Sequence, residues 1–263
     1  MSKLSALYLG LAFLLVGCAS SSESDKTLGW SPNRIYQEAR DEAAAGNNDK
    51  AAQLYEKLEG RAAGTPLAQQ AMLDAAYMRY KTREPAYANA IIERFMRTHP
   101  TSPAMDYALY LKGLVNFNDE SGFFGFLNAQ DLSERDQKAA KDSFETFREL
   151  VTRFPDSKYA ADARARMAYI VNSLAQYEVN VARYYLKRGA YLAAVARAQQ
   201  TIKDYPESPA LEEALAVLVQ AYDAMQLTSL RDDNRRVLQA NFPQSRYLKE
   251  GIREEAKSWW KLW

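Results

Sequence analysis

The chain is poor in the residues from which catalytic and metal sites are most often built. Its 263 residues include one cysteine and one histidine, so it can form no internal disulfide and no zinc cage of Cys and His ligands. A nucleophilic triad with a histidine base would have to use His99. Only 11 glycines and 9 prolines are present, and no phosphate-binding, dinucleotide-binding, zinc-protease or nucleophile-elbow motif occurs. We therefore expect no enzyme, no cofactor and no metal site.

An excess of charge of either sign is also missing. Lysine and arginine number 34 against 33 acidic residues, a net charge of +1. A nucleic-acid-binding domain is normally strongly basic, so we expect no nucleic-acid partner. The apolar share of 48% is that of an ordinary globular chain, and the length is sufficient for one or two domains.

The first 17 residues have the pattern of a secretory signal. Lys3 precedes an apolar run over residues 4–16, which is shorter than the ~20 residues that a transmembrane helix needs. Residues 15–18 read Leu-Val-Gly-Cys and resemble the bacterial lipobox, although Val16 stands where Ala or Ser is commoner. The alternative is an ordinary signal peptide followed by a chance cysteine. We favour lipidation, because the single cysteine of the chain occupies the one position that the motif requires.

Cys18 is thus predicted to carry an N-acyl chain and an S-diacylglycerol group, each buried CH₂ contributing ~0.8 kcal/mol to membrane anchoring. No aspartate follows the cysteine, because Ala19 and Ser20 stand there. The lipoprotein resemblance then implies the periplasmic face of the outer membrane. Residues 18–30 are polar and low in complexity, which predicts a flexible tether.

The remainder of the chain is punctuated at regular intervals. An aromatic or histidine residue, a proline, any residue and a serine recur at residues 99–102, 154–157, 205–208 and 242–245. Serine or threonine at a helix N-cap, often before proline, marks six helix starts. These are Ser31, Thr65, Ser102, Ser157, Ser208 and Ser245, spaced by 34, 37, 55, 51 and 37 residues. Thirty-four residues is the length of a tetratricopeptide repeat, a pair of antiparallel helices, so we predict five helix pairs.

The two longest intervals contain insertions of different kinds. Residues 118–137 contain glycines and aromatics without a helical period, which predicts a loop. Residues 158–188 have apolar side chains every three or four positions and no Gly or Pro until Gly189, which predicts one helix of roughly 30 residues and ~45 Å. The fold class is therefore all-α, a tetratricopeptide-repeat superhelix with one long central helix. It has an N-terminal half at 31–157, a C-terminal half at 158–257 and a tail at 258–263.

Stacked helix pairs produce a groove suited to extended peptides. The predicted groove residues are aromatic or basic and stand on the first helices of units one to three: Tyr36, Arg40, Tyr77, Tyr80 and Tyr107. Some tetratricopeptide grooves hold a peptide carboxylate with Lys and Asn on the first helices. In this chain Tyr36 and Arg40 occupy the matching places, and we therefore expect no carboxylate clamp of that kind. We expect a peptide with aromatic residues and a free carboxylate. His99 fills a position that is aromatic in the other units, which indicates packing.

The tail is unusual because three of the four tryptophans are Trp259, Trp260 and Trp263. One interpretation is that they cap the last helix pair, since the ends of a repeat stack need covering. The other is contact with a partner or with lipid headgroups. We favour the cap.

Residues 105–114 (Met-Asp-Tyr-Ala-Leu-Tyr-Leu-Lys-Gly-Leu) and 181–191 (Val-Ala-Arg-Tyr-Tyr-Leu-Lys-Arg-Gly-Ala-Tyr) carry a specific resemblance. With the lipobox and the punctuation, they make the chain similar to the BamD family of lipoproteins over roughly residues 15–247. The resemblance implies a non-enzymatic scaffold of the outer-membrane β-barrel assembly machinery. Implied partners are the β-barrel insertase, its sister lipoproteins and unfolded outer-membrane proteins. It places the substrate on units one to three and the insertase near Arg188 and Arg197.

Two rival functions remain at this point. One is a periplasmic tetratricopeptide adaptor for cell-wall or division enzymes, which co-purification would distinguish from an assembly factor. The other is an enzyme, which would need a further domain, whereas repeats fill residues 31–257.

Overall fold

The computed structural model describes residues 25–117 and 137–252. These residues form eleven helices and no strand. In chain order the helices are α2 (Pro32–Ala44), α3 (Asn48–Arg61), α4 (Pro66–Lys81), α5 (Pro85–Thr98), α6 (Met105–Phe117), α7 (Gln137–Arg153), α8 (Ala160–Lys187), α9 (Tyr191–Asp204), α10 (Leu211–Ala224), α11 (Thr228–Asn241) and α12 (Tyr247–Glu250).

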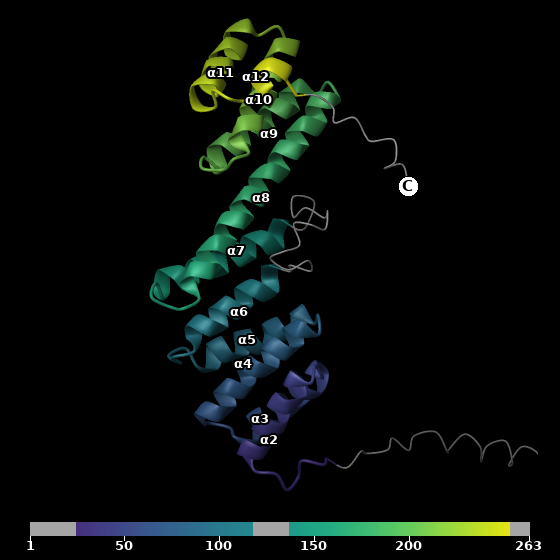
Figure 1. Ribbon diagram of the computed structural model, residues 1–263, viewed down its shortest axis with the longest axis vertical. Coiled ribbons are helices and arrows are strands. Elements are labelled where there is room, and N and C mark those ends of the chain that lie inside the picture. The colour runs from purple at the N-terminus through teal and green to yellow at the C-terminus, as the bar shows by residue number, and fades with distance from the viewer. Residues whose placement is uncertain (1–24, 118–136, 253–263) are drawn as a thin grey trace, which may run out of the picture.

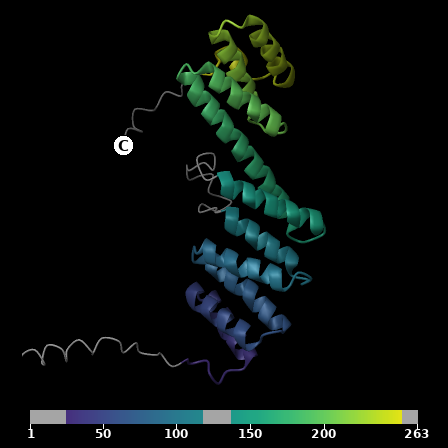
Figure 2. The ribbon, with the colours of Figure 1, turned by 180° about the vertical axis from the view of Figure 1, so that it is seen from behind.

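Consecutive helices pack as antiparallel pairs, from α2–α3 to α10–α11, and the pairs stack into an elongated body (Figure 1). The purple α2–α3 pair lies at one end and α11 with the short α12 at the other, as the view from behind also shows (Figure 2). The prediction of an all-α stack of five helix pairs is confirmed. The long helix predicted over 158–188 is α8, which has 28 residues and runs obliquely between the two ends.

The repeated aromatic-Pro-x-Ser motif ends one helix and shapes the turn before the next. His99, Tyr205 and Phe242 are C-cap residues whose N–H groups donate to the carbonyl four residues back. The carbonyl of each aromatic position then accepts from the serine N–H three residues on, with N···O distances of 2.9 to 3.1 Å. Chain reversal at the motif is therefore built from the same two backbone hydrogen bonds.

Of the predicted helix starts, those after Ser31 and Thr65 are correct, whereas those after Ser102, Ser157 and Ser208 are wrong by two residues. Ser31 and Thr65 cap α2 and α4 by accepting from the N–H three residues on. By contrast, α6, α8 and α10 begin three residues after Ser102, Ser157 and Ser208. There the serine hydroxyl accepts from the N–H two residues on, at 3.2 to 3.3 Å. This local hydrogen bond closes a turn that competes with the first helical turn.

The hydrophobic core divides inside α8. Its first half, up to Leu174, belongs to one cluster with α2–α7, and its second half, from Ala175, belongs to another with α9 and α10. The expected boundary between the two halves lay at residue 158, the start of the long helix. Because α8 contributes to both cores, it connects the two halves through packed side chains as well as through the backbone.

Residues 25–30 differ from the predicted flexible tether. They form turns packed on α3, and Thr27 is buried. Asp25 accepts from Lys57 Nζ at 2.9 Å and from Arg61 Nη2 at 3.3 Å, while the Thr27 carbonyl accepts from Arg61. These contacts come from side chains of α3, which the local composition of the tether could not reveal.

Four of the turns between paired helices place the second residue after the helix in the left-handed region. Gly46 and Gly189 have φ of +83° and +74°, whereas Arg83 and Gln226 have φ of +63° and +61° at the equivalent places. A residue with a Cβ is strained there by about 1–2 kcal/mol, and glycine is not.

Gln226→Gly is therefore expected to raise the free energy of unfolding by about 0.5–1 kcal/mol, because relief of strain exceeds the added chain entropy of glycine. Urea unfolding followed by circular dichroism measures it. Gly189→Gln is the matched control and should lower stability by a similar amount. A Gln226→Gly protein no more stable than the parent would contradict this account.

Candidate functional site

The first helices of units one to three bring the predicted groove residues together. Tyr36 and Arg40 stand on α2, Tyr77 and Tyr80 on α4, and Tyr107 on α6. The rings of Tyr77 and Tyr80 are 6.4 Å apart. Tyr36, Tyr80 and Tyr107 are half-buried against the core, whereas Arg40 is exposed. The first helices of three successive pairs therefore share one polar aromatic surface.

Asp74 of α4 lies at the centre of this surface. Its carboxyl accepts from Gln70 Nε2 at 2.9 Å. Burial raises the pKa of the Asp74 carboxyl, although hydrogen bonds from Gln70 and Tyr36 and the charge of Arg40 oppose the rise. Burial also raises the pKa of Tyr36 and of Tyr107, and in both cases the nearby Asp74 charge adds to the rise. Phenols from α2 and α6 thus flank one carboxylate on α4.

The aromatic surface continues to the start of α8. The Tyr107 ring lies 5.4 Å from that of Tyr159, and the Tyr110 ring stacks on Tyr159 at 4.7 Å. The Tyr110 hydroxyl donates to Asp162 Oδ2 at 2.7 Å. Burial, followed by this hydrogen bond, raises the pKa of Tyr110 to about 12. We call Tyr36, Tyr77, Tyr107, Tyr110 and Tyr159 the tyrosine face.

Asp74, Tyr110 and Tyr159 were missed as site residues. The repeat register contained a signal for the first of them, because Asp74 follows Thr65 by nine residues, as Arg40 follows Ser31. Equivalent places on successive first helices are neighbours in a stack. The structure also changes the chemistry expected of this surface. The carboxylate of Asp74 lies near Arg40, the residue that was expected to bind the carboxylate of a peptide ligand.

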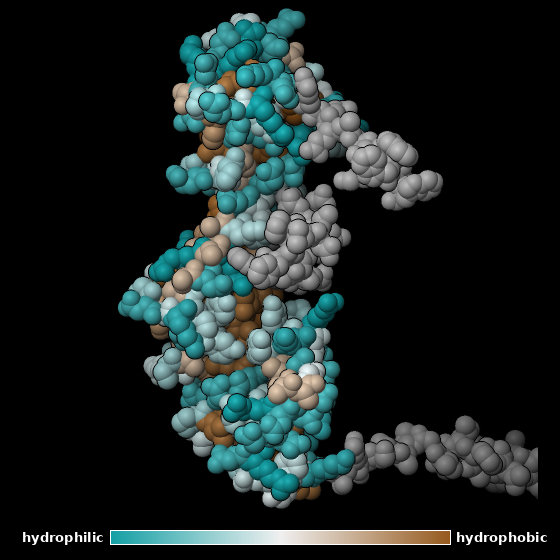
Figure 3. All heavy atoms as spheres, viewed as in Figure 1, coloured by the Kyte–Doolittle hydropathy of each residue, from teal (hydrophilic) through white to brown (hydrophobic). Residues whose placement is uncertain are grey.

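Two clefts lie away from the tyrosine face. One of about 520 Å³ is bounded by the 25–30 turns, α2 and α3, and one of about 410 Å³ by α10, α11 and α12. None of the five predicted groove residues lines either of them. Figure 3 shows that hydrophilic residues cover most of the visible face, while hydrophobic ones appear as scattered patches.

Asp74→Asn is expected to stabilise the protein near neutral pH. The raised pKa means that the folded state holds the Asp74 proton more tightly than the unfolded state, so stability falls as pH rises through and above the ordinary carboxyl range near 3.8. Asparagine removes that loss and keeps an oxygen for Gln70. Urea unfolding from pH 4 to 8 should show the advantage of the variant shrinking towards low pH.

The control for this change is Asp41→Asn at an exposed site on α2. It should not reproduce the stabilisation near neutral pH. A constant difference between Asp74→Asn and the parent across the pH range would contradict the role given to burial.

The two arginines predicted to face the insertase differ in their surroundings. Arg188 is the exposed C-cap residue of α8, and its guanidinium lies 5.2 Å from the Tyr184 ring centre. Tyr184 and Leu192 are 53% and 76% exposed, a high degree for apolar side chains. The α8–α9 turn therefore presents a cation, a ring and an aliphatic side chain to solvent.

Arg197 of α9 is engaged within the fold. Its Nη1 donates to Glu178 Oε2 at 2.9 Å, and the Glu178 side chain is only 12% exposed. The hydrogen bond and charge of Glu178 raise the pKa of Arg197. Glu178 precedes Arg188 by ten residues, about 15 Å along α8, so the two arginines do not form one cluster. Arg197 has a structural role that Arg188 lacks.

Other predictions lie outside the described residues. They are lipidation of Cys18, the loop at 118–137 apart from residue 137, which begins α7, and the Trp-rich tail at 258–263. Within the described ranges, no helix combines the length and the apolar character needed to cross a membrane. The same ranges contain no group of His, Cys, Asp and Glu suited to a metal ion.

Comparison with known proteins identifies the family. A family model described as YfiO, outer membrane lipoprotein, matches residues 30–238. The outer membrane protein assembly factor BamD of Neisseria meningitidis serogroup B is 48% identical over 98% of each chain. BamD of Xylella fastidiosa (strain Temecula1) is 35% identical over 93% of this chain and 83% of its own. BamD of Vibrio cholerae is 35% identical over 87% of this chain and 94% of its own. The resemblance carried by residues 105–114 and 181–191 is thus confirmed, and the chain belongs to the YfiO family of outer membrane lipoproteins, together with the BamD proteins.

Proposed function

We propose that this protein is an outer-membrane protein assembly factor, lipid-anchored at the periplasmic face of the outer membrane. The observation that carries the proposal is the 48% identity to a BamD protein over 98% of both chains. The region of sequence similarity therefore covers both hydrophobic core clusters and α8, the helix that joins them. The comparisons favour this function over an adaptor for cell-wall enzymes.

The role is that of a scaffold rather than of an enzyme. The stack offers two separated surfaces, the tyrosine face on α2, α4, α6 and the start of α8, and the α8–α9 turn at the other end of that helix. The helix α8 connects the cores beneath them. A continuous helix with 28 residues fixes the distance between two bound partners. Binding of both on one rigid body raises their local concentration, which is how a scaffold without catalytic groups promotes assembly.

The tyrosine face is proposed to receive segments of unfolded outer-membrane proteins. Tyrosines contribute large apolar area and a hydroxyl at low entropic cost, which suits segments of varied sequence. Arg40 offers a cation for a peptide carboxylate, and Asp74 offers an acceptor for peptide N–H groups or basic side chains.

The α8–α9 turn is proposed to contact the β-barrel insertase. Arg188 can hold a partner carboxylate in bidentate geometry, while Tyr184 and Leu192 supply exposed apolar area beside it. Arg197 contributes indirectly, because its ion pair with Glu178 ties α9 to α8. Sister lipoproteins of the machinery complete the proposed set of partners.

The experiment that tests the function is depletion of the protein in its own cell, followed by profiling of outer-membrane proteins. We expect porins and other barrel proteins to fall severalfold while inner-membrane proteins stay constant. Wild-type protein supplied from a second copy should restore the profile. Normal porin levels, or co-purification with cell-wall enzymes instead of a barrel insertase, would contradict the proposal.

The substrate surface has its own prediction. Tyr36→Ala and Arg40→Ala are each expected to weaken binding of a C-terminal β-strand peptide of an outer-membrane protein by about tenfold, or ~1.4 kcal/mol. Fluorescence anisotropy of the labelled peptide measures the affinity. Gln37→Ala, at an exposed position between them on α2, is the control and should bind normally. Unchanged affinity in both test variants would rule out this surface.

A further inference from the structure

The turns that precede α2 hold an aliphatic side chain in solvent. Residues 25–30 lie at the end of the body that α2 and α3 form (Figure 1), and Leu28 within them is 76% exposed. Its N–H donates to the Asp25 carbonyl at 3.0 Å, and the Trp30 N–H donates to the Thr27 carbonyl at 2.9 Å. Because these bonds and the burial of Thr27 fix the turns, Leu28 points outward at a defined place.

The cleft of about 520 Å³ beside these turns combines an apolar wall with cations. Trp30 and Leu54 supply its large apolar side chains. Its charged lining consists of three lysines and two carboxylates: Lys26, Lys50, Lys57, Asp25 and Glu38. Asp25 is shared between Lys57 and Arg61, so one carboxylate faces two cations. The surroundings of Leu28 therefore carry more positive than negative charge.

The charges of α3 are divided between two sides of the helix. Its carboxylates Glu56 and Glu59 pair with arginines of α4 and α5, on the side that faces the rest of the stack. Its cations Lys57 and Arg61 instead donate to residues 25–30. The packing of the repeat thus uses acidic groups of α3 inside the stack and leaves basic groups at its first end.

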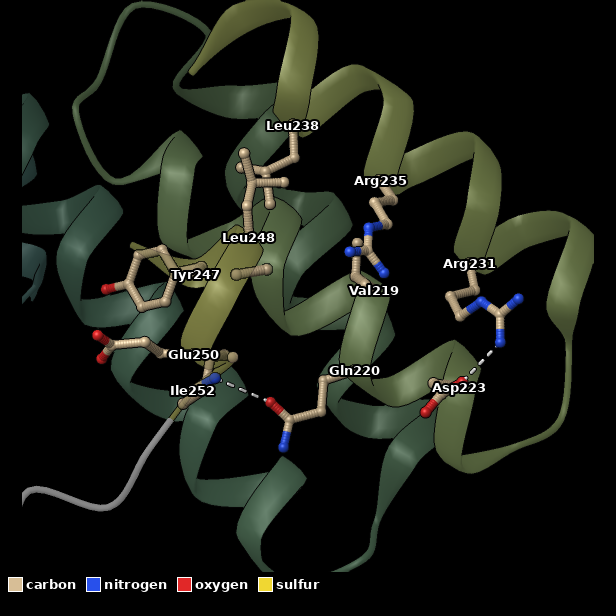
Figure 4. Close-up of a pocket in the computed structure, with 12 residues that line it drawn as sticks. Val219, Gln220, Asp223, Arg231, Arg235, Leu238, Tyr247, Leu248, Glu250 and Ile252 are labelled. Atoms are coloured by element: carbon tan, nitrogen blue, oxygen red, sulfur yellow. Dashed lines mark hydrogen bonds and ion pairs between the residues drawn. The ribbon is translucent and has the colours of Figure 1, made fainter. Parts of the chain in front are cut away.

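The start of α2 adds positive potential at the same end. Arg34, in its first turn, lies 4.3 Å from the Trp30 ring centre, and residues 32–35 include no acidic side chain to offset the positive end of the helix dipole. The cleft at the other end of the stack is balanced by comparison. Its charged lining is two arginines and two carboxylates: Arg231, Arg235, Asp223 and Glu250 (Figure 4).

We propose that this first end, formed by residues 25–30 and the lysines of the adjoining cleft, contacts an anionic membrane surface directly. Leu28 enters the boundary between headgroups and acyl chains, and the ammonium groups bind lipid phosphates while their stems lie along apolar surface. Each cation near such a surface strengthens binding about fivefold. An aliphatic side chain surrounded by cations suits a bilayer, which offers an apolar phase beneath negative charge.

The position of these residues in the chain selects a membrane as the partner, and this step rests on the lipid anchor proposed above. Asp25 follows Cys18 by seven positions, a separation of about 25 Å at most. Attachment at that distance gives the surface an effective concentration on the order of millimolar, so a weak contact suffices. The lipid limits the distance to the bilayer, whereas the second contact sets which way the stack is oriented.

Vesicle binding by a chain without lipid tests this surface separately from the anchor. In the mature chain, residues 18–263, Cys18→Ser removes the only thiol, and Phe in place of the tryptophans at 259, 260 and 263 leaves Trp30 as the only tryptophan. Co-sedimentation should show at least about fivefold tighter binding to phosphatidylglycerol vesicles than to phosphatidylcholine vesicles, and about 0.5 M NaCl should remove the difference. Brominated acyl chains should quench Trp30 in the bound protein.

Two variants locate the contact. Leu28→Ser and Lys26→Glu should each weaken binding to the anionic vesicles by about fivefold. Leu230→Ser on α11 and Lys203→Glu on α9 are the matched controls at exposed positions and should bind as the parent does. Binding that Leu28→Ser leaves unchanged, with Trp30 unquenched, would overturn the proposal.

The same assay separates this proposal from the anchor. Absence of vesicle binding, the result expected if a protein partner covers this end, would overturn the membrane contact even where palmitate labels Cys18 in the cell. Vesicle binding as described, without palmitate labelling, would support the contact and contradict the anchor instead.

Discussion

Phe147→Ala is expected to lower the free energy of unfolding by about 3–5 kcal/mol, the cost of removing a large ring from a closed core. Phe147 of α7 is fully buried, and its ring lies 6.1 Å from that of Tyr110. It also fills the space left open by Gly113 of α6, where an added Cβ would clash with the Phe147 ring. Urea unfolding followed by circular dichroism measures the loss.

The control is the reciprocal change at the glycine. Gly113→Ala should cost about 1–3 kcal/mol through overpacking, even though alanine favours helix. In a Phe147→Leu background the cost of Gly113→Ala should shrink, because the clashing ring is absent. Additive losses in this double-mutant cycle would contradict the close approach of α6 and α7 as the cause.

Cys18→Ser is expected to move the protein from the membrane fraction to the soluble periplasmic fraction. The proposed lipid is the anchor in this account, because each buried CH₂ of its acyl chains contributes ~0.8 kcal/mol to membrane binding. Cell fractionation with immunoblotting measures the distribution. Incorporation of labelled palmitate measures the lipid itself and should fall to background.

Because residues 25–30 pack on α3, the proposed lipid anchor limits how far the α2–α3 pair can lie from the membrane. Asp25 follows Cys18 by seven positions, and an extended chain spans about 25 Å at most over that many residues. Under the proposed lipidation, the α2–α3 pair would therefore stay near the membrane surface. Ser21→Ala is the fractionation control and should remain with the membrane. Palmitate labelling of Cys18→Ser at the parental level would contradict the assignment of the anchor.

The fold could be predicted from the sequence because its signals are local and repeated. The aromatic-Pro-x-Ser motif uses short-range backbone hydrogen bonds that any copy of the motif can form. The apolar spacing of residues 158–188 required one long helix whatever packed against it. Helix starts at Ser102, Ser157 and Ser208 were misplaced, because a serine hydroxyl can either cap a helix or close a turn, and the two patterns share a sequence.

The candidate site was only partly predictable. Tyr36, Tyr77 and Tyr107 were identifiable because aromatic residues recur on the first helices. Asp74 was missed, because only its register in the repeat distinguishes it among 33 acidic residues until the structure places it beside Tyr36 and Tyr107. Arg188 and Arg197 are alike in sequence, but Glu178 beneath α9 makes one of them a structural residue.

Local physical chemistry, contained in the sequence alone, determined the helices, their pairing and the lipid-attachment motif of this protein. The tertiary structure decided which side chains meet across helices. It placed Asp74 among the tyrosines, divided the core within α8 and packed residues 25–30 on α3. It also formed a cleft between α10, α11 and α12, with Ile252 among its lining residues. The physical reason is that burial and pairing depend on neighbours distant in the chain, whereas turns, caps and helical periodicity depend on residues a few positions apart.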